Sequence, residues 1–445
     1  MRRYERIPVA GSAVLVMLAA AAATGLVACG GSSVSSAESP PVSPSQGSST
    51  GDGSATGVSV KPPAVAVAVA EAEQAGTPVD PAIVAADNAF GLRLFGTLLA
   101  GSGGGNIAIS PLSAALVLQI LYNGAAGSTQ QAMAQTLELG ALGVPTLNTD
   151  NAALQASLLD PDPSVQLTIA NSLWLDQGIS PVLPAFTQTD STYYGATVGD
   201  LAGAPANVNA WVDGETQGLI PTLLPAGRYQ DAILANALYF KGRWTTAFDP
   251  ADTVSALFTT SGGGQVSAEL MHQTGLFAYT EGTSHGGKFQ AARIPYGEGR
   301  LTMLIVLPDA AADVRNFVAA ITIDDVDDLI AQLQMSTISL ALPRFTASYG
   351  ASLVAALASM GMGIAFGPSA DFSALAPGFL PNLLEHTTVV EVDETGTVAA
   401  AATGIGTITI VTQPVTMTMN HPFLYAIQDD KTGELLFIGV LMNPS

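Results

Sequence analysis

The sequence predicts an α+β fold in one large domain, and three observations support this prediction. The chain has 445 residues, 48% of them hydrophobic and 11% charged, which is enough apolar material to bury a large core. Patterns typical of helices and of strands follow one another without strict alternation. No internal repeat divides the chain, so we expect one folded domain, from residue 81 to residue 445.

The first helices are indicated by apolar spacing and by capping residues. Ile83 and Phe90 lie on one face of a helical pattern that begins near residue 81. Ser110 and Pro111 precede an apolar run that ends near Leu121. Serine caps helix N-termini and proline suits the first helical position, so we expect the second helix to begin at Pro111.

Strands are indicated by short apolar runs rich in β-branched and aromatic residues. These runs cover residues 172–175, 233–240, 301–307 and 338–342. Near the C-terminus, residues 423–427 and 435–442 flank a turn that contains Asp429, Asp430 and Gly433. That pattern predicts a β-hairpin.

The N-terminal residues predict export and lipid attachment. Arg2 and Arg3 precede an apolar run over residues 14–27, which predicts a signal peptide over residues 1–28. Cys29 follows where a cleavage site should end, and the run resembles the lipobox of bacterial lipoproteins. That resemblance implies that Cys29 is lipidated and anchors the protein to the cell envelope or cell surface, extracellular or periplasmic. A transmembrane helix is the alternative, but the run is shorter than the about 20 residues that span a bilayer.

Residues 29–80 are rich in Ser, Gly, Pro and Ala, a composition that predicts a disordered tether. As a flexible coil of roughly 50 residues, the tether would reach about 40 Å. Cys29 is the only cysteine, so no intramolecular disulfide can form and core packing must stabilise the domain.

Charge and motif content exclude several classes of function. The net charge is -22, with 14 basic against 36 acidic residues, which disfavours nucleic acid and heparin as partners. No G-x-S-x-G or HExxH motif occurs. His272, His285, His386 and His421 are scattered, so we expect neither a catalytic triad nor a metal site, and no cofactor. The expected protein is not an enzyme.

The most unusual segment covers residues 391–411. Four alanines, Ala399 to Ala402, lie between Gly396 and Gly404 and precede a β-branched series that favours extended backbone. This segment resembles the hinge and reactive loop of the serpin family, the serine protease inhibitors.

Further motifs carry the same resemblance from about residue 81 to the C-terminus. They are NIAISPLS at 106–113, NVNAWVDGETQG at 207–218, LANALYFKGRW at 234–244, LALPRF at 340–345 and NHPFL at 420–424. The resemblance implies the serpin fold, with three β-sheets, about eight to nine helices and an exposed reactive loop.

The resemblance also implies a suicide-substrate mechanism, in which the cleaved loop inserts into the central sheet and carries the trapped protease with it. Insertion requires small, uncharged side chains facing inward, and a period of two places Thr397, Ala399, Ala401 and Thr403 there. Ala400 and Ala402 would face outward. The loop from Gly396 to Ile410 spans about 50 Å when extended.

The loop itself indicates which protease would cleave it. The family's hinge length places the scissile bond at Ile410-Val411, and a shift by one residue either way stays open. No Lys, Arg, Phe, Tyr or Trp lies between Gly396 and Asn420. We therefore expect an elastase-like or subtilisin-like serine protease as the target, with a papain-like cysteine protease as a weaker option.

The resemblance assigns structural roles to residues outside the loop. It implies a hydrogen-bonded cluster, called the shutter, beneath the two strands that separate when the loop inserts. The shutter would consist of Ser110, Ser113, Asn236 and His386. Trp244 would lie at the breach where the hinge enters, with Glu394 at the base of the loop.

Two glycines in the distal loop keep an alternative open. Gly404 and Gly406 weaken extended structure by about 0.5 to 1 kcal/mol each relative to alanine. The alternative is a non-inhibitory serpin that serves as a surface binding module.

Overall fold

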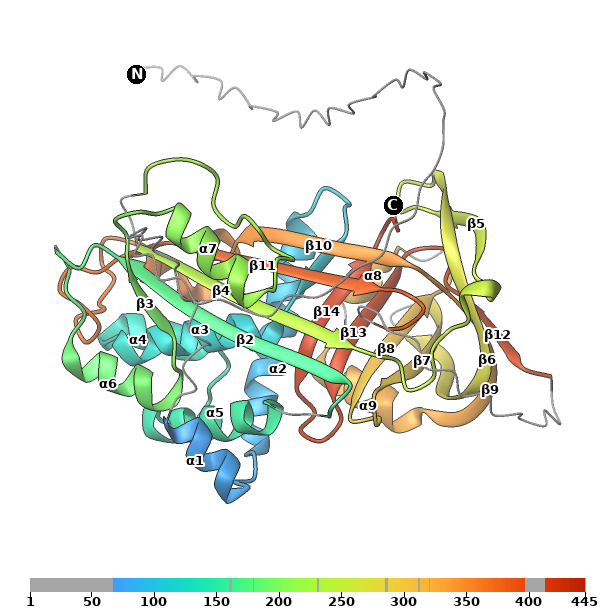
Figure 1. The fold of residues 1–445 in the computed structure, drawn as a ribbon, viewed down its shortest axis with the longest axis horizontal. Helices are drawn as coiled ribbons and strands as arrows, with labels where there is room; N and C mark the ends of the chain where they lie inside the picture. The colour runs from blue at the N-terminus through green and yellow to red at the C-terminus, as the bar shows by residue number, and fades with distance from the viewer. Residues whose placement is uncertain are drawn as a thin grey trace, which may run out of the picture. The chain divides into compact units, whose positions relative to one another are not determined.

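The structure is a computed structural model, and it describes residues 67–159, 162–178, 180–229, 232–284, 287–310, 313–319, 321–396 and 413–444. Figure 1 shows the mixed helices and strands of an α+β fold. In the described ranges the α-helices are α1 (Val67–Ala75), α2 (Pro81–Gly101), α3 (Pro111–Gly124), α4 (Gly127–Thr136), α5 (Val144–Leu158), α6 (Pro184–Tyr193), α7 (Ala206–Glu215), α8 (Val314–Ala319), α9 (Ile323–Gln332) and α10 (Val354–Leu357).

The strands are β1 (Ile107–Ile109), β2 (Val165–Leu175), β3 (Thr197–Asp200), β4 (Ala232–Gly242), β5 (Val254–Thr259), β6 (Gln265–Ser284), β7 (Gly287–Tyr296), β8 (Leu301–Pro308), β9 (Gln334–Pro343), β10 (Phe345–Ser352), β11 (Pro381–Val392), β12 (Val415–Thr418), β13 (Phe423–Asp429) and β14 (Leu435–Leu441). Short helical turns cover Pro250–Asp252, Ala358–Met362 and Gly363–Phe366. The predicted helices after residues 81 and 110, the predicted strands and the C-terminal hairpin are all confirmed.

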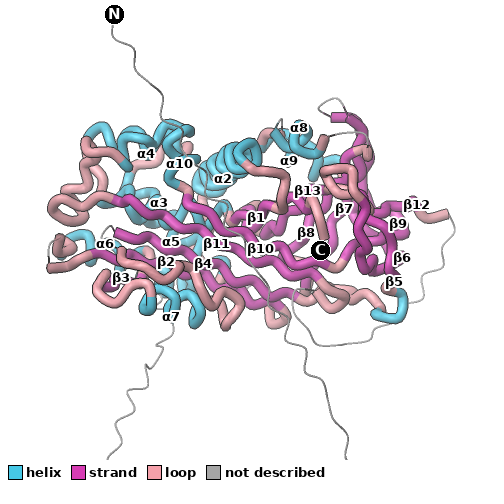
Figure 2. Tube along the Cα trace, turned by 90° about the horizontal axis from the view of Figure 1, so that it is seen from above, coloured by secondary structure: helices cyan, strands magenta, loops and turns pink. Residues whose placement is uncertain are grey.

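A five-stranded sheet has the order β10-β11-β4-β2-β3. β10 pairs with β11 and β4 pairs with β2 in antiparallel fashion, whereas β11 and β4 are parallel neighbours. Figure 2 shows these strands side by side, with α7 on one side of the sheet and α2 and α3 on the other.

The remaining strands form a nine-stranded sheet with the order β1-β14-β13-β8-β7-β6-β9-β12, and β5 pairs with β6. Three sheets were expected, but the 20-residue β6 is continuous, and it pairs with β9 over residues 270–279 and with β7 over residues 278–284. Hydrogen bonding therefore joins two of the expected sheets into one. The described part of the chain also has ten α-helices, because α1 lies before the predicted domain and α10 is a single turn.

The core lies between the sheets and is centred on α2 and α3. The Ser110 hydroxyl accepts a hydrogen bond from the backbone N–H of Ser113, so the predicted cap of α3 is confirmed. α2 packs closely on the start of α3 at Gly91, where a Cβ atom would lie 2.8 Å from the Pro111 Cγ. α2 is long and apolar enough to span a membrane, yet much of it is buried in this core.

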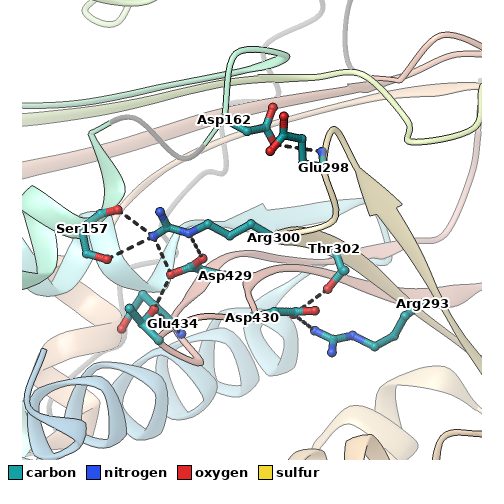
Figure 3. A network of polar contacts seen from close by, with 10 residues as sticks. Ser157, Asp162, Arg293, Glu298, Arg300, Thr302, Asp429, Asp430 and Glu434 are labelled. Atoms are coloured by element: carbon teal, nitrogen blue, oxygen red, sulfur yellow. Dashed lines mark hydrogen bonds and ion pairs between the residues drawn. The ribbon is translucent and has the colours of Figure 1, made fainter. Parts of the chain in front are cut away.

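Polar contacts connect the β13–β14 hairpin to a helix and a neighbouring strand (Figure 3). Asp429 is fully buried and accepts a hydrogen bond of 2.7 Å from the Nε of Arg300. The Arg300 Nη2 also donates to the Ser157 carbonyl oxygen at 2.6 Å. Arg293 and Thr302 both donate to Asp430. The hairpin is thus pinned to α5 and β8.

The N-terminal boundary of the folded region differs from the prediction. The tether was expected to extend to residue 80, but residues 67–75 form α1, and Val69 is buried against Ala152 of α5. Alanine and glutamate in this stretch favour a helix, and packing against a partner stabilises one that is marginal alone. The predicted signal peptide, Cys29 and the rest of the tether lie outside the described residues.

Candidate functional site

The seam between β4 and β11 is only partly closed. The two strands pair in parallel register as far as Thr387 and Ala237. Both strands continue beyond these residues, and each stays paired with its outer neighbour, β11 up to Val392 and β4 up to Gly242. Residues 388–392 and 238–242 therefore have no pairing across the seam in this described part of the sheet.

The open half of the seam ends at the base of the loop. After β11 the chain makes a tight turn in which the Asp393 carboxylate accepts hydrogen bonds from the N–H groups of Thr395 and Gly396, at 2.9 and 3.1 Å. Gly396 then forms an isolated antiparallel bridge with Arg243, directly after β4. The turn therefore connects the end of β11 to the end of β4.

Gly396 is required at this bridge. Its φ of 134° is unfavourable for a side chain, and a Cβ atom would lie 2.6 Å from the Arg243 Cα and 2.7 Å from the Trp244 nitrogen. The backbone of the loop base can approach β4 this closely only without a side chain.

Glu394 anchors the turn from the other side. Its side chain is nearly fully buried, and both carboxylate oxygens accept from the Arg344 Nη2 at 2.5 Å. Thr253 donates to the same carboxylate at 2.7 Å, and the Phe248 N–H donates to the Glu394 carbonyl oxygen at 2.8 Å. Burial alone would raise the pKa of Glu394, but the bonds from Arg344 and Thr253 outweigh it and lower the pKa.

Trp244 lies at the mouth of the seam. Its indole Nε1 donates to the Asp393 carbonyl oxygen at 2.9 Å, and its ring stacks on Tyr296 with 4.3 Å between ring centroids. The side chain is 4% exposed. It therefore covers the point where β4 and the loop base meet.

Replacing Arg344 by alanine is expected to lower the free energy of unfolding by about 2 kcal/mol, because it leaves the buried Glu394 carboxylate without its cation. Arg93→Ala is the matched control, since the Arg93–Glu138 ion pair is exposed on both sides and contributes less than about 1 kcal/mol. Urea unfolding of both variants measures the difference. Equal losses would show that the Arg344–Glu394 pair contributes no more than a surface ion pair.

A second polar cluster lies beneath the paired half of the seam. The Ser113 hydroxyl donates to the Asn236 Oδ1, and the Asn236 Nδ2 donates to the Asn171 Oδ1 at 2.6 Å. The Ser110 backbone N–H donates to the His386 Nε2 at 3.1 Å. His386 and Asn236 are register partners on β11 and β4. The structure thus brings together the four residues assigned to the shutter.

Their bonding differs from a simple side-chain network. Ser110 uses its hydroxyl to cap α3, so it contacts His386 through its backbone. The His386 side chain is buried and its Nδ1 has no hydrogen-bond partner among the described residues. Burial lowers the pKa of His386 to about 4, so the imidazole is neutral and only weakly basic at neutral pH.

Replacing Ser113 by alanine is expected to destabilise the protein by about 2 kcal/mol, since the buried Asn236 Oδ1 then loses its donor. Ser191→Ala, on the exposed face of α6, serves as the control and should change the free energy of unfolding by less than about 0.5 kcal/mol. Chemical unfolding measures the free energy of unfolding of both variants. A Ser113→Ala variant as stable as the wild type would show that the Ser113–Asn236 hydrogen bond does not stabilise the fold.

Several predicted site residues lie outside the described residues. They are Thr397, Ala399, Ala400, Ala401, Ala402, Thr403, Ile410 and Val411. The chain is described up to Gly396, and β12, which runs parallel to β9, begins at Val415.

The structure also adds three residues to the candidate site that the sequence did not single out. Arg344 lies in the LALPRF motif. The sequence offered one indication of its role, namely that a basic residue in this motif could pair with an acidic residue near the loop. Asn171 extends the polar cluster through its hydrogen bond with Asn236. In the sequence, the only indication of this role is that Asn171 is a polar residue within an apolar strand. No pattern in the sequence indicated that Thr253 would contact Glu394.

Comparisons with known proteins agree with this geometry. Residues 85–444 match the family model described as serpin (serine protease inhibitor). The chain is 30% identical over 392 residues to Serpin-Z2A of Triticum aestivum, covering 81% of this chain and 96% of the relative. It is 30% identical over 378 residues to the leukocyte elastase inhibitor of Homo sapiens, covering 81% and 98%.

Among solved structures, the native state of a thermophilic serpin, tengpin, superposes with a TM-score of 0.75 at 29% identity. The match covers 82% of this chain and 95% of that structure. The chain therefore belongs to the serpin family.

Proposed function

We propose that this protein inhibits a serine protease as a suicide substrate. The protease cleaves the loop near Ile410-Val411, forming an ester between its serine and the Ile410 carbonyl and releasing the Val411 amine. The loop then enters the seam between β4 and β11, and the protease remains attached as an acyl-enzyme.

The observation that carries this proposal is the half-open parallel seam. A strand that folds back after β11 runs antiparallel to both β11 and β4. It can therefore form antiparallel pairing with both strands. If the two neighbouring strands were antiparallel to each other, it could be antiparallel to only one of them. Residues 388–392 and 238–242 lie unpaired across the seam at the end where the loop begins.

Entry requires the loop base to come apart first. Two contacts close the seam at the end where the loop begins. They are the Arg243–Gly396 bridge and the hydrogen bond from the Trp244 N–H to the Thr395 carbonyl oxygen. The Glu394 anchor holds the turn itself. These contacts keep the intact loop outside until cleavage frees its far end.

The predicted bait favours an elastase-like or subtilisin-like protease. Ile410 and Val411 suit a shallow pocket that accepts β-branched aliphatic residues. The human relative that is 30% identical is named a leukocyte elastase inhibitor, which supports the same class. A papain-like cysteine protease is the weaker option.

We further propose that the mature protein is exported and held at the cell envelope through a lipid on Cys29. The support is the basic and apolar N-terminus followed by a Ser/Gly/Pro/Ala-rich stretch. Metabolic labelling with an alkyne fatty acid should label the wild type and leave Cys29→Ser unlabelled.

The test of the inhibitory function mixes the protein with pancreatic elastase and, separately, with subtilisin. We expect a complex that survives denaturing electrophoresis, and mass spectrometry should place the new C-terminus at Ile410 or one residue away. Cleavage without any complex, and with no gain in thermal stability, would contradict the proposal and favour the non-inhibitory binding module.

A further inference from the structure

We propose that a cavity beside the edge of β2, between α5 and α7, is a binding site for a small primary amine that carries one aromatic ring. The ammonium group would pair with the carboxylate of Glu215, and the ring would occupy the apolar part of the cavity. This inference goes beyond the proposed function and does not depend on it, because neither the loop nor its insertion is involved.

The short length of β3 leaves room for the cavity. β3 pairs only with Ser172–Leu175 of β2, although β2 begins at Val165 and pairs with β4 from there on. In the described part of the chain, no strand covers the other edge of β2 from residue 166 to residue 171. Beside this edge lies a partly enclosed cavity with a volume of about 180 Å³. A protein cavity of about 150 Å³ can bind benzene, so this space accommodates one aromatic ring with a short substituent.

Much of the cavity wall is apolar. α5 and β2 contribute aliphatic side chains, and α7 and the end of α6 contribute aromatic rings; these residues are Leu158, Leu167, Ile169, Trp211 and Tyr194. A ring that leaves water for this space gains the free energy of apolar burial. The wall therefore favours a ligand with an apolar body.

One carboxyl group in the wall has no partner. Glu215 lines the cavity and is only 9% exposed. Its side chain forms no hydrogen bond or ion pair with the described residues, and burial raises its pKa because nothing compensates for the ionised form. Buried carboxylates in proteins are normally paired. The missing partner is thus a cation that the described residues do not supply.

Two further features favour an ammonium group at this end of the cavity. Trp211 lies one turn before Glu215 on α7, and residues four apart share one face of a helix, so the indole lies beside the carboxylate. The face of an indole ring attracts cations. Along the uncovered edge of β2, every second residue directs its backbone carbonyl away from β4, and these carbonyls can accept the remaining protons of a primary ammonium.

The test titrates benzylamine into the full chain at neutral pH and follows the heat of binding. Benzyl alcohol is the matched neutral ligand, since it has nearly the same size and shape. We expect saturable binding of benzylamine, and binding of benzyl alcohol that is weaker by at least about tenfold, because the alcohol forms no ion pair with Glu215. Glu215→Gln should abolish this preference. Asp213→Asn, at an exposed position of the same helix, should retain it.

A second variant shows where the ligand binds. Leu159 lines the cavity and is 40% exposed, so it lies at the entrance, and Leu159→Trp should weaken the binding of both ligands by a similar factor. Glu215→Gln should be at least as stable as the wild type, because it removes a buried charge without a partner.

Three results would overturn the proposed site. They are no saturable binding of benzylamine to the wild type, a preference for the amine that survives Glu215→Gln, and binding that is unchanged in Leu159→Trp. All three are read without a protease, so they are distinct from failure of the proposed function, in which the wild type would form no protease complex whether or not it binds the amine.

Discussion

Replacing Ala401 by arginine is expected to convert the protein from an inhibitor into a substrate. Ala401 belongs to the set of hinge residues predicted to face inward, so in the proposed mechanism its side chain would enter the core between β4 and β11. An unpaired guanidinium there costs several kcal/mol, and each 1.36 kcal/mol slows insertion about tenfold. The protease would then hydrolyse its ester before the loop is in place.

Ala402→Arg is the matched control, because period-two alternation turns that side chain outward. The measurement is the number of inhibitor molecules consumed for each protease molecule inactivated. We expect this number to rise at least about tenfold in Ala401→Arg and to change little in Ala402→Arg. Equal loss of trapping in both variants would show that the alternation is misassigned or that the loop does not insert.

Acid is expected to weaken the seam through His386. The folded state holds the pKa of this buried side chain at about 4, against a value of 6.5 in the unfolded chain. As the pH falls below 6.5, the unfolded chain binds a proton that the folded protein does not, so stability is lost between pH 6.5 and 4. Above pH 6.5 this contribution is fully present. The loss amounts to about 3 kcal/mol at pH 4.

Urea unfolding between pH 7.5 and 4 measures this loss, and His386→Gln should reduce the pH dependence. Ser191→Ala, on the exposed face of α6, does not remove a titratable group and should keep the wild-type slope. A wild-type stability that is flat across this range would mean that His386 is not buried in neutral form. Because His386 faces Asn236 across the seam, the same acid range should also speed exchange of the β4 and β11 amides.

Features encoded by neighbouring residues could be predicted from the sequence. Ser110 and Pro111 start α3 because capping and a fixed φ act within one turn, and the C-terminal hairpin follows from its turn residues, with Gly433 at a φ of 85°. The small residues of the hinge are a local pattern too, but they lie outside the described residues, so their role stays a prediction.

Features that depend on distant partners could not be predicted in this way. The seam joins residues near 235 to residues near 385, and nothing local sets where pairing between β4 and β11 stops. Glu394 was assigned to the loop base, but its pairing with Arg344 depends on how the turn after β11 meets the link between β9 and β10. α1 was missed because its alanine-rich stretch has no clear apolar face in the sequence. Packing against α5 and α6 stabilises it as a helix.

In the proposed mechanism the cleaved loop becomes a strand between β4 and β11. The most direct test cuts the loop with thermolysin, which uses zinc-bound water and cannot be trapped as an acyl-enzyme, and compares thermal unfolding before and after cleavage. A strand paired on both sides adds hydrogen bonds of about 1 kcal/mol each, so we expect the midpoint to rise by roughly 20 °C or more. A cleaved protein that unfolds at the same temperature as the intact one would contradict insertion.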